Sequence, residues 1–129
     1  MYLPISLASV AAAAFTNIWL TMRIGMVRSA KKISVGDGGD DELIRRMRAQ
    51  ANFIENTPIM LIMIAVIELS RPGNLWLAGV AALYALGRIA HGVGMDGGVF
   101  KAGRSVGTLI TMVSLIGLGI WAATIALDM

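Results

Sequence analysis

The stretch SVGTLITMVSLIGLGIWAATIAL, residues 105–127, decides the fold class, because its 23 residues include no charged side chain. The hydrocarbon core of a bilayer is about 30 Å thick, and an apolar helix of about 20 residues crosses it. At the other end of the chain, the stretch MYLPISLASVAAAAFTNIWLTM, residues 1–22, is equally free of charge. We therefore predict a transmembrane helix at each end of the sequence.

Residues 1–22 have one feature of a signal peptide, since four alanines occupy positions 11–14. A signal peptide carries its basic residues before the apolar segment. Here the first basic residues, Arg23 and Arg28, come after it. We therefore expect residues 1–22 to stay in the mature protein as a membrane span and not to be cleaved off.

Two further candidate membrane segments, in the middle of the sequence, are bounded by charged residues. Residues 56–67 and 72–87 are uncharged, but each stretch is too short to cross a bilayer. Helices reach the required length only if they include ionisable residues, and Pro72 and Gly73 provide the turn between them. We predict an all-α membrane protein, a bundle of four transmembrane helices in a single domain, 1–129. The expected helices span about 3–28, 43–70, 74–95 and 105–127.

The amino-acid composition limits the classes of protein to which the chain can belong. The chain is 57% apolar and 15% charged, whereas soluble proteins have roughly 25% charged residues. We therefore do not expect an ordinary soluble enzyme. The absence of cysteine excludes disulfides, thiolate metal sites and cysteine nucleophiles in this chain, and we predict no metal site. The net charge of +3 comes from basic residues at the ends of apolar runs, which indicates membrane topology and no nucleic-acid partner.

The basic residues predict the orientation of the helices. All but one of them lie near the loops at about 29–42 and 96–104, and the exception is Arg71. Because cytoplasmic loops are enriched in lysine and arginine, we expect these two loops to face the cytoplasm and both termini to face the opposite side. Arg45 and Arg46 are interpreted as anchors for lipid headgroups. Asp40 or Asp41 is expected to cap the second helix.

Several polar side chains fall within the expected membrane segments. Arg48, Asn52 and Glu55 follow one another at helical spacing and so share a face. Charged groups at mid-bilayer cost on the order of 3 kcal/mol and usually face a bundle interior or a wet cavity. Arginine binds carboxylates bidentately, and Glu55 can accept hydrogen bonds from an ammonium group. The following residues therefore suit a ligand with several carboxylates and one amine: Arg28, Arg48, Asn52, Glu55, Arg88, His91 and Arg104.

Purely structural interpretations of these residues stay open. Glu55 can clamp two helices by pairing with Arg48 or Arg88, and Asn52 can hydrogen-bond across helices. His91 is better interpreted as a packed side chain than as a metal ligand, since the chain has no second histidine and no cysteine.

The run RAQANFIENTP, residues 48–58, resembles the second-helix signature of the MAPEG superfamily, the membrane-associated proteins of eicosanoid and glutathione metabolism. The similarity covers nearly the whole chain and includes Val27-Arg28, Lys31-Lys32 and Arg104-Ser105-Val106. Among bacterial members, the chain is most similar to a small inner-membrane type. It differs from characterised eukaryotic members at His91 and Met95, where those proteins commonly carry tyrosines.

The resemblance implies a homotrimer that holds glutathione between subunits on the cytoplasmic side. It also implies that Arg104 stabilises the glutathione thiolate and that Ser105 lies beside the sulfur. By the same resemblance, Arg28, Arg48, Asn52, Glu55 and Arg88 bind the tripeptide or order its pocket. His91 differs from the family residue, and we include it among the ligand-binding candidates because of its place in the polar set described above.

The function expected from this resemblance is that of a glutathione-dependent membrane transferase or peroxidase. Its partners would be the lipid bilayer, other copies of the chain and a small hydrophobic electrophile of unspecified identity, and its location would be a bacterial inner membrane. The alternative is a non-enzymatic membrane protein of the same fold that binds lipid, a glutathione-like ligand or a partner. A small four-helix drug exporter is disfavoured, because such exporters depend on a carboxylate in the first helix and this first span has none.

Overall fold

The computed structural model describes residues 2–128 and contains four long helices. They are α1 (Pro4–Lys31), α2 (Asp41–Ser70), α3 (Leu75–Gly94) and α4 (Ala102–Leu127), with a short 3-10 helix, η1 (Gly98–Phe100), before α4. Each long helix is long and apolar enough to cross a membrane. No strand occurs among the described residues. The chain is therefore an all-helical membrane protein, as predicted.

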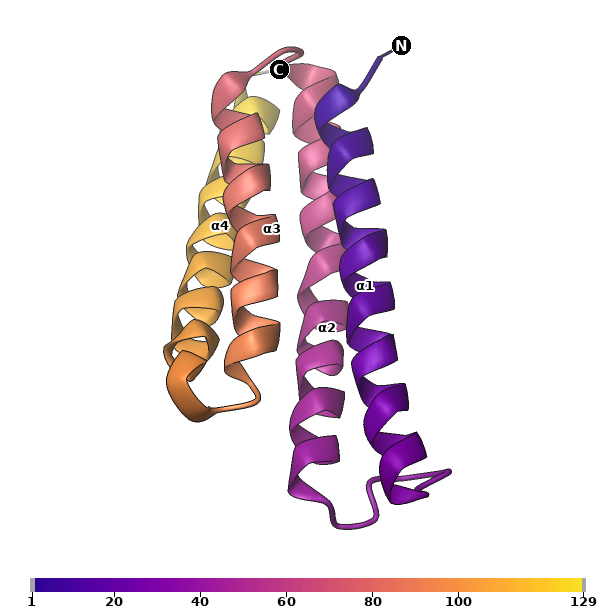
Figure 1. The fold of residues 1–129 in the computed structure, drawn as a ribbon. Helices are drawn as coiled ribbons and strands as arrows, with labels where there is room; N and C mark the ends of the chain where they lie inside the picture. Colours follow the sequence, from indigo (N-terminus) through magenta and orange to yellow (C-terminus); the bar gives the residue numbers. More distant parts are fainter. Residues whose placement is uncertain (1, 129) are drawn as a thin grey trace.

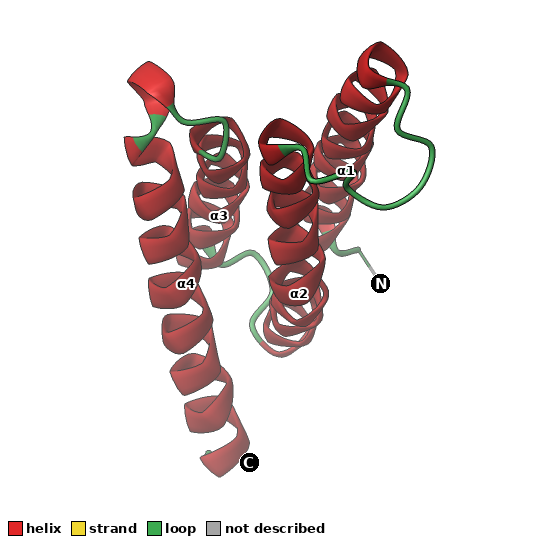
Figure 2. Cartoon of the chain, turned by 90° about the horizontal axis from the view of Figure 1, so that it is seen from below, coloured by secondary structure: helices red, strands yellow, loops and turns green. Residues whose placement is uncertain are grey.

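The helices form two antiparallel pairs, α1 with α2 and α3 with α4 (Figure 1). Viewed along the helices, the two pairs lie side by side (Figure 2). Both described chain ends lie at the end of the bundle that also holds the α2–α3 turn, and the two longer connections lie at the other end, here called the loop end (Figure 1). At the loop end the α1–α2 pair extends beyond the α3–α4 pair.

A close backbone approach holds α3 against α4. A Cβ atom added to Gly107 would lie 2.4 Å from the carbonyl oxygen of Gly87 and 2.6 Å from Cβ of His91. A Cβ atom on Gly94 would lie 2.0 Å from the backbone nitrogen of Arg104. Small residues at such positions let membrane helices pack closely. Glycine at these positions therefore fixes how α4 lies along α3.

The apolar core lies toward the end of the bundle that holds the chain ends. Met60, Ile64 and Ile67 of α2 pack there with Leu77 of α3 and Leu118 of α4, and each is at most 2% exposed. A second, smaller cluster of Leu20, Ala49 and Phe53 joins α1 to α2 nearer the loop end. Between these clusters, polar side chains from α2, α3 and α4 enter the interior.

The helix ends follow capping chemistry. Asp40 accepts a hydrogen bond from the backbone N–H of Leu43, which confirms that an aspartate of this loop caps the second helix. The first helix continues to Lys31, about one turn beyond the prediction, and ends where Lys32 adopts a left-handed conformation and bonds back to the carbonyl of Arg28. Helix α4 begins at Ala102 instead of 105, so Arg104 lies inside its first turn.

An unpredicted contact caps α1. The residue before this helix, Leu3, offers no side-chain cap. Glu68, near the end of α2 and 1% exposed, instead accepts hydrogen bonds from the backbone N–H groups of Ile5 at 2.9 Å and Ser6 at 2.8 Å. The Ser6 hydroxyl donates a third bond at 2.5 Å. Because unpaired N–H groups at a helix start attract anions, this carboxylate joins the two helices where they meet.

Candidate functional site

An open groove of about 890 Å³ lies at the loop end of the α3–α4 pair. Its volume falls in the range of about 300–1,000 Å³ typical of small-molecule sites. Its polar lining residues are Arg45, Lys101, Arg104, Ser105 and Thr108. Its apolar lining residues include Met95, Ala102, Leu109 and Met112. The groove thus offers both cations and apolar surface to a bound molecule.

Arg104 and Ser105 occupy the first turn of α4, and both are exposed. Among the described residues, the Arg104 guanidinium makes no hydrogen bond or ion pair to another side chain or to the backbone. Its five donors are therefore available to a ligand. The contact between Gly94 and the backbone of Arg104 fixes the position of this turn on α3.

Arg88 and Asn52 meet inside the bundle. Arg88 is 2% exposed, and its Nη2 donates to the Asn52 side-chain oxygen at 2.7 Å. Its Nη1 donates to the hydroxyl of Thr111 at 3.0 Å, while Nε has no partner among the described residues. Asn52 thus makes the interhelical hydrogen bond that was one of its two interpretations. Thr111 supplies an acceptor that the sequence did not identify.

His91 lies one turn beyond Arg88 on α3 and is 4% exposed. Its backbone and Cβ atom face Gly107 of α4, at one of the close approaches between the two helices. Its Nδ1 has no hydrogen-bond partner among the described residues. His91 is therefore a packed side chain within the chain, and its prediction as a glutathione-binding residue stays a prediction.

Arg28 orders the loop after α1. Its Nη1 donates to the carbonyl of Gly36 at 2.7 Å and to that of Ile33 at 3.3 Å. These contacts hold the glycine-rich segment against the end of the helix. A ligand that binds Arg28 would have to share its guanidinium with these carbonyls.

Arg48 and Glu55 lie on the outer surface of α2, and both are exposed. Neither lines the groove that contains Arg104. Within residues 2–128, Glu55 forms no ion pair, so the alternative interpretation, a clamp between Glu55 and Arg48 or Arg88, is not seen within the chain. The eight predicted site residues therefore lie in three places of the chain: the α4 groove, the interior of the bundle, and the outer and loop-end surfaces of α1 and α2.

The structure adds two basic residues to the candidate site. Arg45 and Lys101 line the groove with Arg104, although Arg45 is far from the other two in the sequence. The sequence indicates that Arg45 and Arg46 anchor lipid headgroups; in the structure, the Arg46 side chain pairs with Glu42 at 3.2 Å and with Asp96 at 3.4 Å. No local sequence signal distinguishes these roles, because they depend on where the loop before α4 lies against α2.

Comparison with known proteins agrees with this architecture. The model of the MAPEG family matches residues 6–124, nearly the whole chain. Searches of curated proteins and of solved structures give no match. With its four membrane-spanning helices, the chain belongs to the MAPEG family, the membrane proteins of eicosanoid and glutathione metabolism.

Proposed function

We propose that this protein binds glutathione in the α4 groove, activates its thiol as a thiolate and transfers it to a lipophilic electrophile. The single observation that carries the proposal is Arg104, an exposed arginine without a protein partner among the described residues, beside the Ser105 hydroxyl in a groove with apolar lining residues. Family membership supports the choice of thiol.

The chemistry follows from the charges around the groove. A cation beside a thiol favours the ionised sulfur, and it does so more strongly where apolar surroundings exclude water. Arg45, Lys101 and Arg104 supply positive charge, and Ser105 offers a hydroxyl hydrogen to the sulfur. The thiol proton passes to water, and the thiolate is the nucleophile that reacts.

The apolar residues that line the groove favour an electrophile that arrives from the bilayer. Leu109 and Met112 extend the groove along α4 toward the apolar part of the helix, and both are exposed. In a transfer, the sulfur forms a bond to the electrophilic carbon and the leaving group departs with its electron pair. In a peroxidase reaction, the sulfur attacks a peroxide oxygen and the O–O bond breaks, which gives a glutathione sulfenic acid and, after protonation, an alcohol. The thiol of a second glutathione then attacks the sulfenic sulfur and gives glutathione disulfide and water.

We propose that the remaining predicted residues contribute through a homotrimer. Arg48 and Glu55 are exposed on α2 and unpaired within the described chain, as expected of residues that meet a ligand between subunits. Arg88 and Asn52 order the interior behind them. We also propose a bacterial inner-membrane location with the loop end facing the cytoplasm, supported by the basic residues at that end.

The test is turnover with a matched control. Purified protein is incubated with glutathione and a dinitrophenyl electrophile, and product formation is measured for the wild type, Arg104→Ala and Arg71→Ala. Arg71 lies in the exposed α2–α3 turn at the opposite end of the bundle, so its substitution removes the same charge far from the groove. We expect product from the wild type and Arg71→Ala, and a large loss for Arg104→Ala.

Other outcomes would change the proposal. Saturable glutathione binding without product would support the binding-only alternative. No binding at millimolar glutathione would overturn the proposal. Full activity of Arg104→Ala would assign thiol activation to a different residue.

A further inference from the structure

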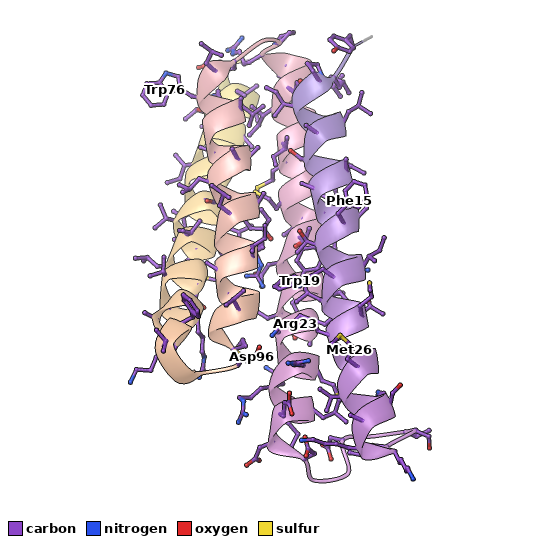
Figure 3. The ribbon with its side chains drawn as sticks, in the orientation of Figure 1. Phe15, Trp19, Arg23, Met26, Trp76 and Asp96 are labelled. Carbon is purple, nitrogen blue, oxygen red and sulfur yellow. The ribbon has the colours of Figure 1, made fainter. Side chains whose placement is uncertain are left out.

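An ion-pair bridge joins the two helix pairs at the loop end. Asp96, in the connection between α3 and η1, pairs with Arg23 of α1 through one carboxylate oxygen. Its other oxygen accepts from Nε of Arg46 of α2 at 3.4 Å. Figure 3 shows Arg23 and Asp96 directed toward one another from α1 and from the end of α3. The carboxylate thus contacts both helices of the opposite pair.

Both arginines of the bridge are held in place by further contacts. The Arg23 guanidinium lies 4.7 Å from the centroid of the Trp19 ring, and its Nη1 donates to the carbonyl of Gly92 at 2.8 Å. Arg46 donates to the carbonyl of Arg23 at 3.0 Å. The two arginine side chains are only 12% and 18% exposed. Isolated surface ion pairs contribute little, but a network of partly buried, multiply bonded arginines has a defined geometry.

The bridge acts on the groove because of where Asp96 lies. Its neighbours Met95 and Gly97 both line the groove with Arg104. Gly94 comes directly before Met95, and its backbone lies against that of Arg104, with no room for a Cβ atom between them. A shift of Asp96 relative to α1 and α2 therefore moves one wall of the groove and the turn that carries Arg104.

From this geometry we infer that Asp96 is a positioning residue, and that its bridge to Arg23 and Arg46 sets where the Arg104 groove stands relative to α1 and α2. The inference rests on the proposed function for the identity of the ligand. The residues of the proposed binding set are divided between the two helix pairs, with Arg104 and Ser105 on one and Arg48 and Glu55 on the other. Asp96 therefore affects how well glutathione is held and leaves the ionisation of its sulfur to Arg104.

The first test measures geometry and needs no ligand. Because the chain has no cysteine, Ser29→Cys and Val99→Cys introduce the only two thiols for spin labels, one on α1 and one on η1. Labelled subunits are diluted with unlabelled protein, so that measured distances come from one chain. We expect Asp96→Asn and, separately, Arg23→Gln to broaden or shift the distance distribution. Asp128→Asn, which removes the same charge at the other end of the bundle, should leave it unchanged. An unchanged distribution in both bridge variants would overturn the inference.

The second test separates positioning from general structural damage. In Asp96→Asn we expect the KM for glutathione to rise on the order of tenfold, since a displacement of about 1 Å weakens an oriented site. The pH at which bound thiol ionises should stay at the wild-type value, and Asp96→Glu should restore part of the affinity. An altered distance distribution with an unchanged KM would overturn the positioning role. Wild-type protein that binds no glutathione would overturn the proposed function, whereas the distance measurement decides the bridge independently.

Discussion

The contact between α3 and α4 provides a quantitative prediction, because Gly107 and Gly117 form a matched pair on one helix. A methyl group at position 107 would lie 2.4 Å from the Gly87 carbonyl oxygen and 2.6 Å from Cβ of His91, whereas ordinary contacts begin near 3.4 Å. The helices must therefore separate by about 1 Å at this point. A methyl group at position 117 would meet nothing within 4 Å in the same chain.

The two substitutions share one effect and differ in the other. Replacing glycine by alanine inside a helix gains about 1 kcal/mol in helix propensity at either position. Only Gly107→Ala adds the cost of overpacking, typically about 1–3 kcal/mol. The difference between the two variants therefore isolates the close approach, with Gly107→Ala less stable by about 1–3 kcal/mol.

The assay is reversible unfolding of both variants in micelles by denaturant titration, followed by circular dichroism. Gly107→Ala should unfold at lower denaturant than Gly117→Ala. Equal stabilities would show that α4 does not approach α3 as closely as the structure describes. A selective loss for Gly117→Ala would place the critical helix contact at position 117, where the structure shows no neighbour within 4 Å.

Three further predictions concern other polar contacts. Glu68→Gln should lower the free energy of unfolding by on the order of 3 kcal/mol, because an amide cannot accept all the hydrogen bonds now donated by Ile5 and Ser6. Glu55→Gln, an exposed match on the same helix, should change this free energy little. Equal losses in the two variants would contradict the capping role of Glu68. Asn52→Ala should cost about 1–3 kcal/mol by leaving Arg88 Nη2 without its acceptor, and comparison with Asn56→Ala, whose side chain bonds within its own helix, tests this in the same unfolding assay. The ammonium group of Lys31, followed by the N–H of Leu43, lowers the pKa of the Asp40 carboxyl below its ordinary 3.8. The resulting contribution to stability is therefore present above about pH 4 and is lost as the pH falls through the folded-state pKa. Unfolding measured against pH should show a loss of stability in that acid range, and Asp40→Asn should reduce that loss.

The sequence was sufficient to predict the helices, because transmembrane segments leave a composition signal along the chain. Residues 105–127 and 1–22 required little beyond a count of charges, and Asp40 is a cap that local chemistry explains. The extra turn of α1 was missed, since it depends on the left-handed conformation of Lys32.

The arrangement of the candidate site was harder to predict, because its polar groups meet only after the helices pack. Helical spacing placed Asn52 on a face with Arg48 and Glu55, but only the structure shows that Asn52 turns inward to Arg88 while the other two stay outside. The role of Asp96 depends on a loop that reaches across to α1 and α2, and no motif marks it. The Glu68 cap likewise joins residues more than 60 positions apart.

The most direct test of the proposed chemistry is the ionisation of bound glutathione followed by ultraviolet absorbance of the thiolate as pH is raised. A free thiol ionises near pH 8.5. If the Arg104 groove stabilises the thiolate, half-ionisation of the bound thiol will occur below that value in the wild type and return toward it in Arg104→Ala. A bound thiol that ionises at the same pH as free glutathione, in both proteins, would contradict the account.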